Sequence, residues 1–278
     1  MLRSRLLICL LSFAGVAVSA QDYPQRIVSM NLCTDQLLLL LVDKQRIASL
    51  SYFARDPEYS ALASLAEGIP PNRGQADEVI TFAPDLILTS QFSATLAANL
   101  LERMNYKVHR LGFAASLEEV FDQIHEVSEV TGSQASAEKL ITTIRRDIAF
   151  QQEGLLQELQ GKSAVFFASN GFTYGSASLQ DSFIRSLGMR NIAAEAGISG
   201  PALLSLEVLI AAAPDYLFID QGRAHDTRLA HPMLQHPAFA SHAARTRSVT
   251  LADTYFQCAG PQFALAYAEL AEQLRDEN

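Results

Sequence analysis

Tryptophan is absent from this 278-residue chain, and cysteine occurs only three times. So few thiols cannot form a disulfide-stapled scaffold, which leaves a hydrophobic core to hold the fold together. Apolar residues make up 49% of the chain, enough for such a core and too many for a disordered protein. Positive charge is also scarce, with 21 Lys and Arg against 30 Asp and Glu. This acidic balance argues against nucleic acid as a partner.

The N-terminus has the pattern of a secretory signal peptide. Arg3 and Arg5 precede an apolar run over residues 6–18, and small residues follow up to Ala20. A run of thirteen residues is too short to span a bilayer core of about 30 Å, so we expect cleavage after Ala20 rather than a membrane anchor. Without these 20 residues and their two arginines, 258 residues remain, with 19 basic and 30 acidic groups and a net charge of −11. No later run is long and apolar enough for a transmembrane helix, so we expect a soluble exported protein.

Short apolar strands alternate with helical segments along the rest of the chain. The first strand runs directly into a helix that Thr34 or Asp35 can cap. Strands are predicted at residues 26–31, 46–51, 86–89, 108–111, 163–168 and 216–219, and helices at 77–82, 93–104, 116–130, 179–187, 205–212 and 263–275. This alternation is typical of mostly parallel sheets with helices on their faces.

Residues 133–160 have a different character. They follow a break at Thr131-Gly132, contain no proline, and are interrupted only by Gly154. A helix over this stretch would be roughly 40 Å long, more than a crossover within a compact domain needs. It is either one more surface helix or a rigid connection between two lobes.

An internal repeat at an offset of 130 residues favours two lobes. The segment 77–88 superposes on 207–218, so that Ala83-Pro84-Asp85 falls on Ala213-Pro214-Asp215. Each copy begins with a carboxylate, Asp77 or Glu207, in the first turn of a short helix that proline ends. One such copy is a common α/β turn, and the helix dipole alone accounts for its acid. Two copies on either side of a long helix indicate two similar α/β lobes.

Several segments, in their order and spacing, carry a family resemblance: residues 26–29, 35–38, 46–51, 85–88, 204–208 and 236–239, together with the long helix. With them the mature chain resembles the periplasmic substrate-binding proteins of ABC importers for iron chelates and cobalamin. The resemblance implies an α/β fold of two Rossmann-like lobes joined by a single long helix, with the ligand cleft between the lobes. The expected division is a signal peptide (1–20), an N-terminal lobe (21–132), a bridging helix (133–160) and a C-terminal lobe (161–278).

The resemblance also implies a function and its partners. We expect a monomeric periplasmic protein that captures a ferric siderophore, haem or a cobalamin-like corrinoid and delivers it to an ABC permease and its ATPase at the inner membrane. No catalytic residue, resident cofactor or bound metal is expected. In this family an acid on each lobe is thought to engage basic residues of the permease, and the matching positions are Asp77 and Glu207, with Glu78 beside the first.

Ligand-binding candidates lie in loops at the carboxyl ends of strands, where open α/β sheets bind their ligands. Tyr52 and Phe172 match positions where cobalamin-binding relatives place aromatic rings, whereas the Trp residues of those relatives have no counterpart here. Arginine side chains can bind carboxylate, hydroxamate or propionate groups in a bidentate manner. The candidates are Cys33, Tyr52, Arg55, Arg73, Ser90, Phe172, Arg223, Tyr255 and Cys258.

Cys33 and Cys258 are expected in loops of opposite lobes near the cleft, and three states remain open. Partly buried free thiols come first, because free cysteine is usually found there. A pair facing the ligand comes second. A disulfide comes third, because it requires Cα atoms within about 7 Å and would pin the lobes together across the ligand site.

Two alternative functions are kept. His225, His231, His236 and His242 would suit a zinc- or metal-ion-binding importer component, although their spacings of 6, 5 and 6 lack the tight pairs of structural zinc sites. A secreted α/β hydrolase is the other alternative, but the chain has no G-x-S-x-G nucleophile elbow, and neither a P-loop nor G-x-G-x-x-G follows a strand.

Overall fold

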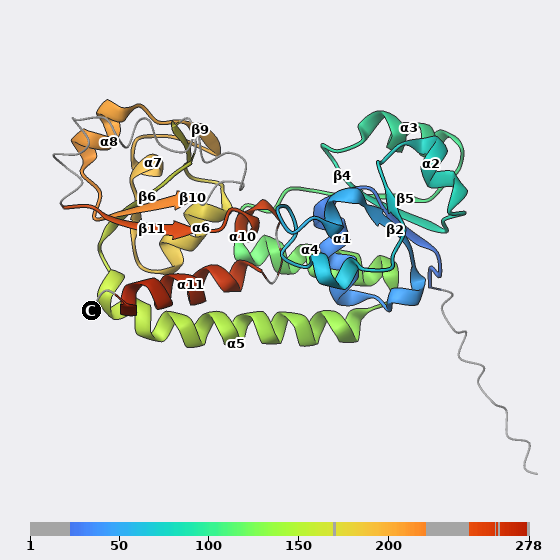
Figure 1. Cartoon of the computed structure of the whole chain (residues 1–278), viewed down its shortest axis with the longest axis horizontal. Helices are drawn as coiled ribbons and strands as arrows, with labels where there is room; N and C mark the ends of the chain where they lie inside the picture. Colours follow the sequence, from blue (N-terminus) through green and yellow to red (C-terminus); the bar gives the residue numbers. More distant parts are fainter. Residues whose placement is uncertain (1–22, 169–170, 221–244, 259, 261, 277–278) are drawn as a thin grey trace, which may run out of the picture.

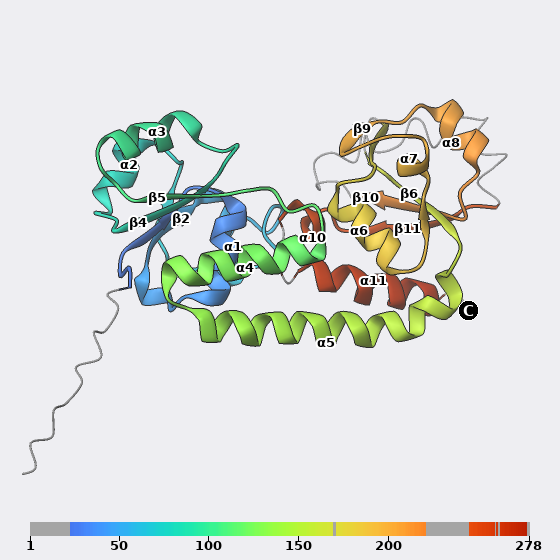
Figure 2. The ribbon, with the colours of Figure 1, turned by 180° about the vertical axis from the view of Figure 1, so that it is seen from behind.

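The computed structural model describes residues 23–168, 171–220, 245–258, 260 and 262–276. Two α/β lobes lie side by side, and one long helix, α5 (Gln134–Leu159), runs beneath both of them (Figures 1 and 2). Each lobe has its own parallel sheet. The predicted fold class, two Rossmann-like lobes joined by a single long helix, is therefore confirmed.

The N-terminal lobe contains a five-stranded parallel sheet in the order β3-β2-β1-β4-β5. Its strands are β1 (Ile27–Ser29), β2 (Ile47–Ser51), β3 (Pro71–Asn72), β4 (Leu86–Ser90) and β5 (Val108–Leu111). Its helices are α1 (Leu32–Leu41), α2 (Ala76–Thr81), α3 (Thr95–Arg103) and α4 (Leu117–Thr131), with short 3-10 helices at Lys44–Arg46, Tyr52–Arg55 and Ala63–Ala66. Alternate residues of the strands point to opposite faces. Ile27 and Leu86 accordingly join the core under α1 and α4, while Val28 and Ile87 join the core under α2 and α3.

The C-terminal lobe repeats this plan with a four-stranded parallel sheet in the order β11-β10-β6-β8. Its strands are β6 (Ser163–Phe167), β8 (Arg190–Asn191), β10 (Tyr216–Asp220) and β11 (Arg247–Leu251), and β7 (Phe172–Tyr174) pairs antiparallel with β9 (Pro201–Leu203). Its helices are α6 (Leu179–Ser186), α7 (Ile192–Glu195), α8 (Leu206–Ala212), α10 (Thr254–Gln257) and α11 (Phe263–Asp276). Phe166 and Phe218 face the core that α6 and α11 cover, whereas Val165 and Leu217 face the one that α7 and α8 cover.

Each strand and helix predicted from the sequence is present, but several further elements were missed. They include β3, β7, β8 and β9, which have two or three residues each, and β11, which lies in a stretch predicted to be rich in loops. Residues 1–22, with the predicted signal peptide, lie outside the described residues. Within the described ranges, no helix is both long and apolar enough to cross a bilayer.

Helix α5 joins the lobes through one buried stripe. Its buried side chains follow helical spacing: Ala137, Ile141, Ile144, Ile148, Leu155 and Leu159. The N-terminal half packs against α1 and α4, and the C-terminal half packs against α11. As a result one continuous hydrophobic core extends through both lobes.

The internal repeat has a structural counterpart. Each of the helices α2 and α8 is followed, within two residues, by an alanine with positive φ that directly precedes the proline: Ala83 at 45° and Ala213 at 41°. Left-handed backbone is unfavourable for alanine, so the same uncommon turn at both sites reflects a shared local constraint. The strand that follows, β4 or β10, then enters the centre of its sheet.

The aspartate after this proline has the same role in both lobes. Asp85 accepts hydrogen bonds from the backbone amides of Gln25 (2.6 Å) and Arg26 (3.0 Å), at the start of β1. Asp215 accepts them from the amide and hydroxyl of Ser163, both at 2.8 Å, at the start of β6. The hydrogen bond from the Ser163 backbone amide is also the main reason why the pKa of Asp215 lies below its ordinary value. Each aspartate thus fixes the register between two central strands.

A fully buried carboxyl group joins helix α1 to the end of strand β2. Asp35 on α1 accepts hydrogen bonds from the backbone amide and the hydroxyl of Ser51, where β2 ends. Burial raises the pKa of Asp35 to about 7 and outweighs the hydrogen bonds from Ser29 and Ser51, which lower it. The group therefore changes charge near neutral pH.

Replacing Asp35 with asparagine should remove a pH-dependent part of the stability. Folding raises the pKa of this carboxyl from an ordinary value of 3.8 to about 7. The carboxyl group therefore adds its full contribution to the free energy of unfolding below about pH 4. This contribution is lost as the pH rises to about 7, and the loss is at most on the order of 4 kcal/mol. Denaturant titrations at about pH 4 and about pH 8 should show a larger decline for the wild type than for Asp35→Asn. Asp77→Asn, which removes an exposed carboxylate, is the control. An equal decline in the free energy of unfolding for wild type and Asp35→Asn would contradict the raised pKa of Asp35.

Candidate ligand-binding cleft

Three adjoining cavities form a cleft where the carboxyl ends of the two sheets face each other. Their volumes are about 380 Å³ on the C-terminal side, 100 Å³ in the centre and 440 Å³ on the N-terminal side. Phe113, Phe256 and Gln257 line both the first and the second, and Asn31 lines both the second and the third. Because neighbouring cavities have lining residues in common, the three together form one interlobe cleft. Such an edge is the usual ligand position in open α/β sheets.

The C-terminal side of the cleft has an aromatic wall. Phe166 of β6 meets Tyr174 edge to face at 6.5 Å between ring centroids, and it meets Phe256 of α10 at 5.0 Å. Phe113 comes from the opposite lobe, in the loop after β5, and its side chain is 66% exposed. Aromatic rings on both sides of a gap suit a flat, largely apolar ligand.

Polar groups are few on this side and already oriented. The Gln257 amide donates a hydrogen bond of 2.7 Å to the Asp253 carboxylate, and both residues line the cavity. Gln180 lines it from the first turn of α6, whose N-terminus is capped by the Ser178 hydroxyl. An apolar cavity with a small number of fixed amides and one carboxylate is typical of a small-molecule site.

The N-terminal side is more polar. Asn31 caps α1 by accepting a hydrogen bond from the Cys33 amide, and its side-chain amide donates to the Ser93 hydroxyl at 2.8 Å. Phe53 and Tyr59 line this cavity with ring centroids 4.9 Å apart, and Arg73 lies at its edge. A ligand spanning the cleft would thus meet rings at both ends and hydrogen-bonding groups between them.

The structure brings together some of the predicted ligand-binding residues. Cys33 and Ser90 line the central cavity, and Arg73 lines the N-terminal one. Tyr52 and Phe172 are exposed, at 48% and 44%, but lie outside all three cavities.

Two further candidates have partners elsewhere. The Arg55 guanidinium donates to the carbonyl oxygen of Ile69. Tyr255 contacts Glu269, and burial together with that carboxylate raises the pKa of its hydroxyl. Arg223 lies outside the described residues, so its predicted role is not tested.

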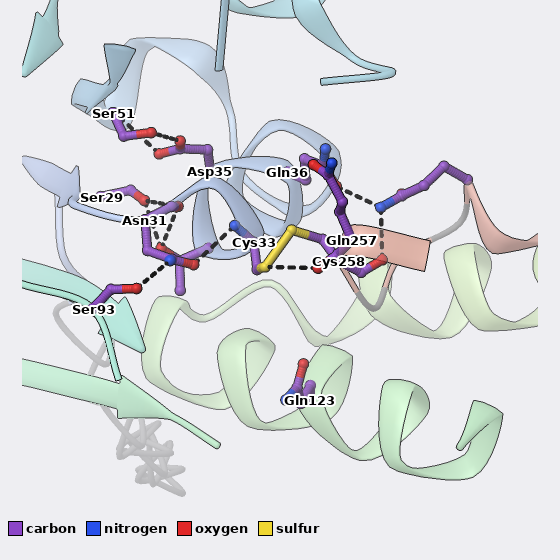
Figure 3. Close-up of a disulfide and its surroundings, with 12 residues drawn as sticks. Ser29, Asn31, Cys33, Asp35, Gln36, Ser51, Ser93, Gln123, Gln257 and Cys258 are labelled. Atoms are coloured by element: carbon purple, nitrogen blue, oxygen red, sulfur yellow. Dashed lines mark hydrogen bonds between the residues drawn. A yellow bond between two sulfur atoms is a disulfide. The ribbon is translucent and has the colours of Figure 1, made fainter. Parts of the chain in front are cut away.

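Cys33 and Cys258 form a disulfide, which corrects the order of the three states predicted for them (Figure 3). Their Cα atoms are only 4.9 Å apart, although 225 residues separate them in the sequence. Free thiols were ranked first because free cysteine is usually partly buried, and the disulfide last because it would pin the lobes together across the ligand site. The short helix α10 instead brings Cys258 directly to the N-terminus of α1. Cys258 is buried, and the pair is not a pair of thiols facing the ligand.

The acids of the internal repeat lie away from the cleft walls. Asp77 and Glu207 are both exposed, on α2 and α8, on the side of the molecule opposite α5 (Figure 1). The Glu78 carboxylate accepts a hydrogen bond from the Arg73 amide at 2.7 Å, so it already has a local role.

The histidines of the zinc alternative all lie in residues 221–244, outside the described part of the chain. Among the described residues, no group of three His, Cys, Asp or Glu side chains is placed to hold a metal ion.

Phe113 is the clearest site residue that sequence reasoning missed. It follows strand β5 in Gly112-Phe113-Ala114, a loop at a carboxyl end that was left out of the candidates. The rule that loops after parallel strands form the site would have included it. Phe166 was missed for a different reason, because it lies within a strand rather than in a loop. Phe256 was missed although its neighbour Tyr255, on the same short helix, was a candidate.

Comparisons with known proteins agree with this architecture. The family model for periplasmic binding proteins matches residues 27–255. The vitamin B12-binding protein of Photorhabdus laumondii is 24% identical over 280 residues, covering 98% of this chain and 94% of its own. A cobalamin-binding protein of Halobacterium salinarum is 22% identical over 204 residues, covering 73% of this chain but only 55% of the relative.

The fold has solved counterparts as well. The periplasmic heme-binding protein of a Roseiflexus species aligns with a TM-score of 0.72 at 22% identity, covering 91% of this chain and 98% of that one. Because the family model spans most of the sequence and both lobes, this chain is a member of the periplasmic binding protein family.

Proposed function

We propose that this protein is the substrate-binding component of an ABC importer and that it captures a metal chelate in the interlobe cleft. The chelate class comprises ferric siderophores, haem and corrinoids. It is supported by relatives whose names specify cobalamin, vitamin B12 and heme. On this proposal the protein is not an enzyme and works with a permease and its ATPase. It acts in the periplasm as a monomer after removal of residues 1–20.

The observation that carries the proposal is the aromatic cleft at the facing sheet edges. Phe113 from one lobe and Phe166, Tyr174 and Phe256 from the other provide rings on both sides of one cavity. A planar conjugated chelate can stack on such rings and bury a large apolar area. Asn31 and Gln257 offer amide groups to the ligand's polar periphery.

Thermal-shift measurements against haem, cobalamin, cobinamide and ferric siderophores test the proposal directly. Binding to the folded state raises the unfolding midpoint in proportion to the logarithm of ligand excess over Kd. We expect one of these chelates to raise the midpoint at micromolar concentration. If none of them does so, the chelate class is wrong.

Replacing Phe113 with alanine should weaken binding of that chelate by about tenfold, since a stacked aromatic contact contributes on the order of 1 kcal/mol plus the buried area. The side chain is largely exposed, so the fold should be unaffected. Phe150→Ala is the matched control, because Phe150 is 74% exposed on α5, away from the cleft. Titration calorimetry measures the chelate affinity of both variants. Equal affinities would contradict the proposed site.

We also propose that Asp77 and Glu207, one on each lobe, dock the permease. Both carboxylates are exposed on short helices at the same side of the molecule, where a flat partner can reach both (Figure 1). Two charges on separate lobes fix orientation and speed encounter more than they add affinity. Glu78 contributes less on this view, because its carboxylate is tied to the Arg73 amide.

Reversing both charges, with Asp77→Lys and Glu207→Lys, should reduce chelate import by about tenfold or more while leaving chelate affinity unchanged. The control is Glu138→Lys with Glu153→Lys, which makes the same change in charge at exposed positions of α5. Uptake of labelled chelate into cells that lack the native protein is the measurement. Equal uptake by the two double variants would rule out these docking residues.

A further inference from the structure

The disulfide between Cys33 and Cys258 is a covalent connection between the two lobes. Cys33 is the second residue of α1, immediately after the carboxyl end of β1, and Cys258 follows α10 of the C-terminal lobe. Within the described residues the backbone passes between the lobes through α5, so the disulfide adds a second covalent connection. In Figures 1 and 2, α1 and α10 lie on the cleft side of α5. The two connections are therefore at different depths of the interlobe boundary.

Noncovalent contacts surround the disulfide and cross the same boundary. One turn along α1 from Cys33, Gln36 accepts a hydrogen bond from the Gln262 amide, which also donates to the carbonyl oxygen of Cys258 at 2.9 Å (Figure 3). Both glutamines are almost fully buried, at 1% and 2% exposure. The Cys33 sulfur lies 3.7 Å from the carbonyl oxygen of Gln257. The lobes are thus joined by a small, buried and hydrogen-bonded contact as well as by the disulfide.

This contact adjoins the cleft. Cys33 and Gln257 both line the central cavity, next to Asn31 on one lobe and Phe256 on the other. A bend of α5 that separated the lobes would have to pull α1 away from α10, and the covalent bond prevents that movement. The width of the gap between Phe113 and the C-terminal aromatic wall would then be set before any ligand arrives.

We propose that Cys33 and Cys258 are positioning residues whose disulfide holds the two lobes at a fixed separation and so preforms the cleft. That a ligand uses this cleft rests on the proposed function, whereas the fixed separation of the lobes is independent of it. A preformed cleft binds with a smaller loss of conformational entropy, which favours ligands that match its width. In this proposal the cysteines act on the ligand through the lobe geometry.

Single-molecule energy transfer across the cleft tests this without any ligand. Dyes are attached through non-natural amino acids, independently of thiol chemistry, at Leu96 on α3 and Leu203 on β9, which are 87% and 66% exposed. The disulfide-bonded protein should give one narrow distance distribution. Cys33→Ser with Cys258→Ser, and wild type reduced by dithiothreitol with its thiols then alkylated, should both give a broader distribution shifted to longer distances. Reduced wild type that is reoxidised instead of alkylated should return to the narrow distribution.

Two controls separate lobe positioning from general stability. A dye pair within the C-terminal lobe, at Leu203 and Leu265, should give the same distribution in every form, because both positions lie in the same lobe. Gln36→Ala keeps the disulfide and should keep the narrow distribution across the cleft. Identical interlobe distributions in oxidised, reduced and serine forms would overturn the proposal. So would loss of folded circular dichroism in both the reduced and the serine forms, since the bond would then serve folding rather than positioning. Neither result depends on whether a chelate binds.

Discussion

Everything else in this molecule depends on the buried stripe of helix α5. One row of apolar side chains, from Ala137 to Leu159, packs against helices of both lobes and joins their cores into one. A crossover made of extended strands would let the lobes swing, whereas 26 residues of helix, about 39 Å long, resist bending. The sheets are thereby held with their carboxyl ends facing each other. The cleft and its aromatic walls follow from that orientation.

The repeated Ala-Pro-Asp motif shows how local chemistry produces two similar lobes. In each copy the alanine takes a left-handed conformation, the proline ends the helix, and the aspartate binds backbone amides at the start of the neighbouring central strand. The motif is thus explained by the pairing of β4 with β1 and of β10 with β6. The recurrence of the motif is therefore evidence for the fold. It does not explain Asp77 and Glu207 at the starts of the two helices.

Much of the fold could be predicted from the sequence, because periodicity and proline act locally. The long helix, the alternating strands and both copies of the repeat are local patterns, and the resemblance of ordered segments gave the family. The disulfide could not be predicted in this way. The contact between Cys33 and Cys258 depends on how α10 crosses the boundary, which no pattern within either segment specifies. Phe166 and Phe256 likewise become cleft residues only when the two lobes are brought together.

The carboxylates of this acidic chain divide into groups with different physical roles. Asp35 is buried and supports Ser51, while Asp85 and Asp215 satisfy backbone amides between strands. A carboxylate already used in this way is costly to redirect, because its partners would lose a hydrogen bond. Asp77 and Glu207 occupy the exposed surface instead, in matching positions on the two lobes. The docking proposed above needs exposed carboxylates at equivalent places on both lobes, because only such a pair lets one partner contact both lobes at once.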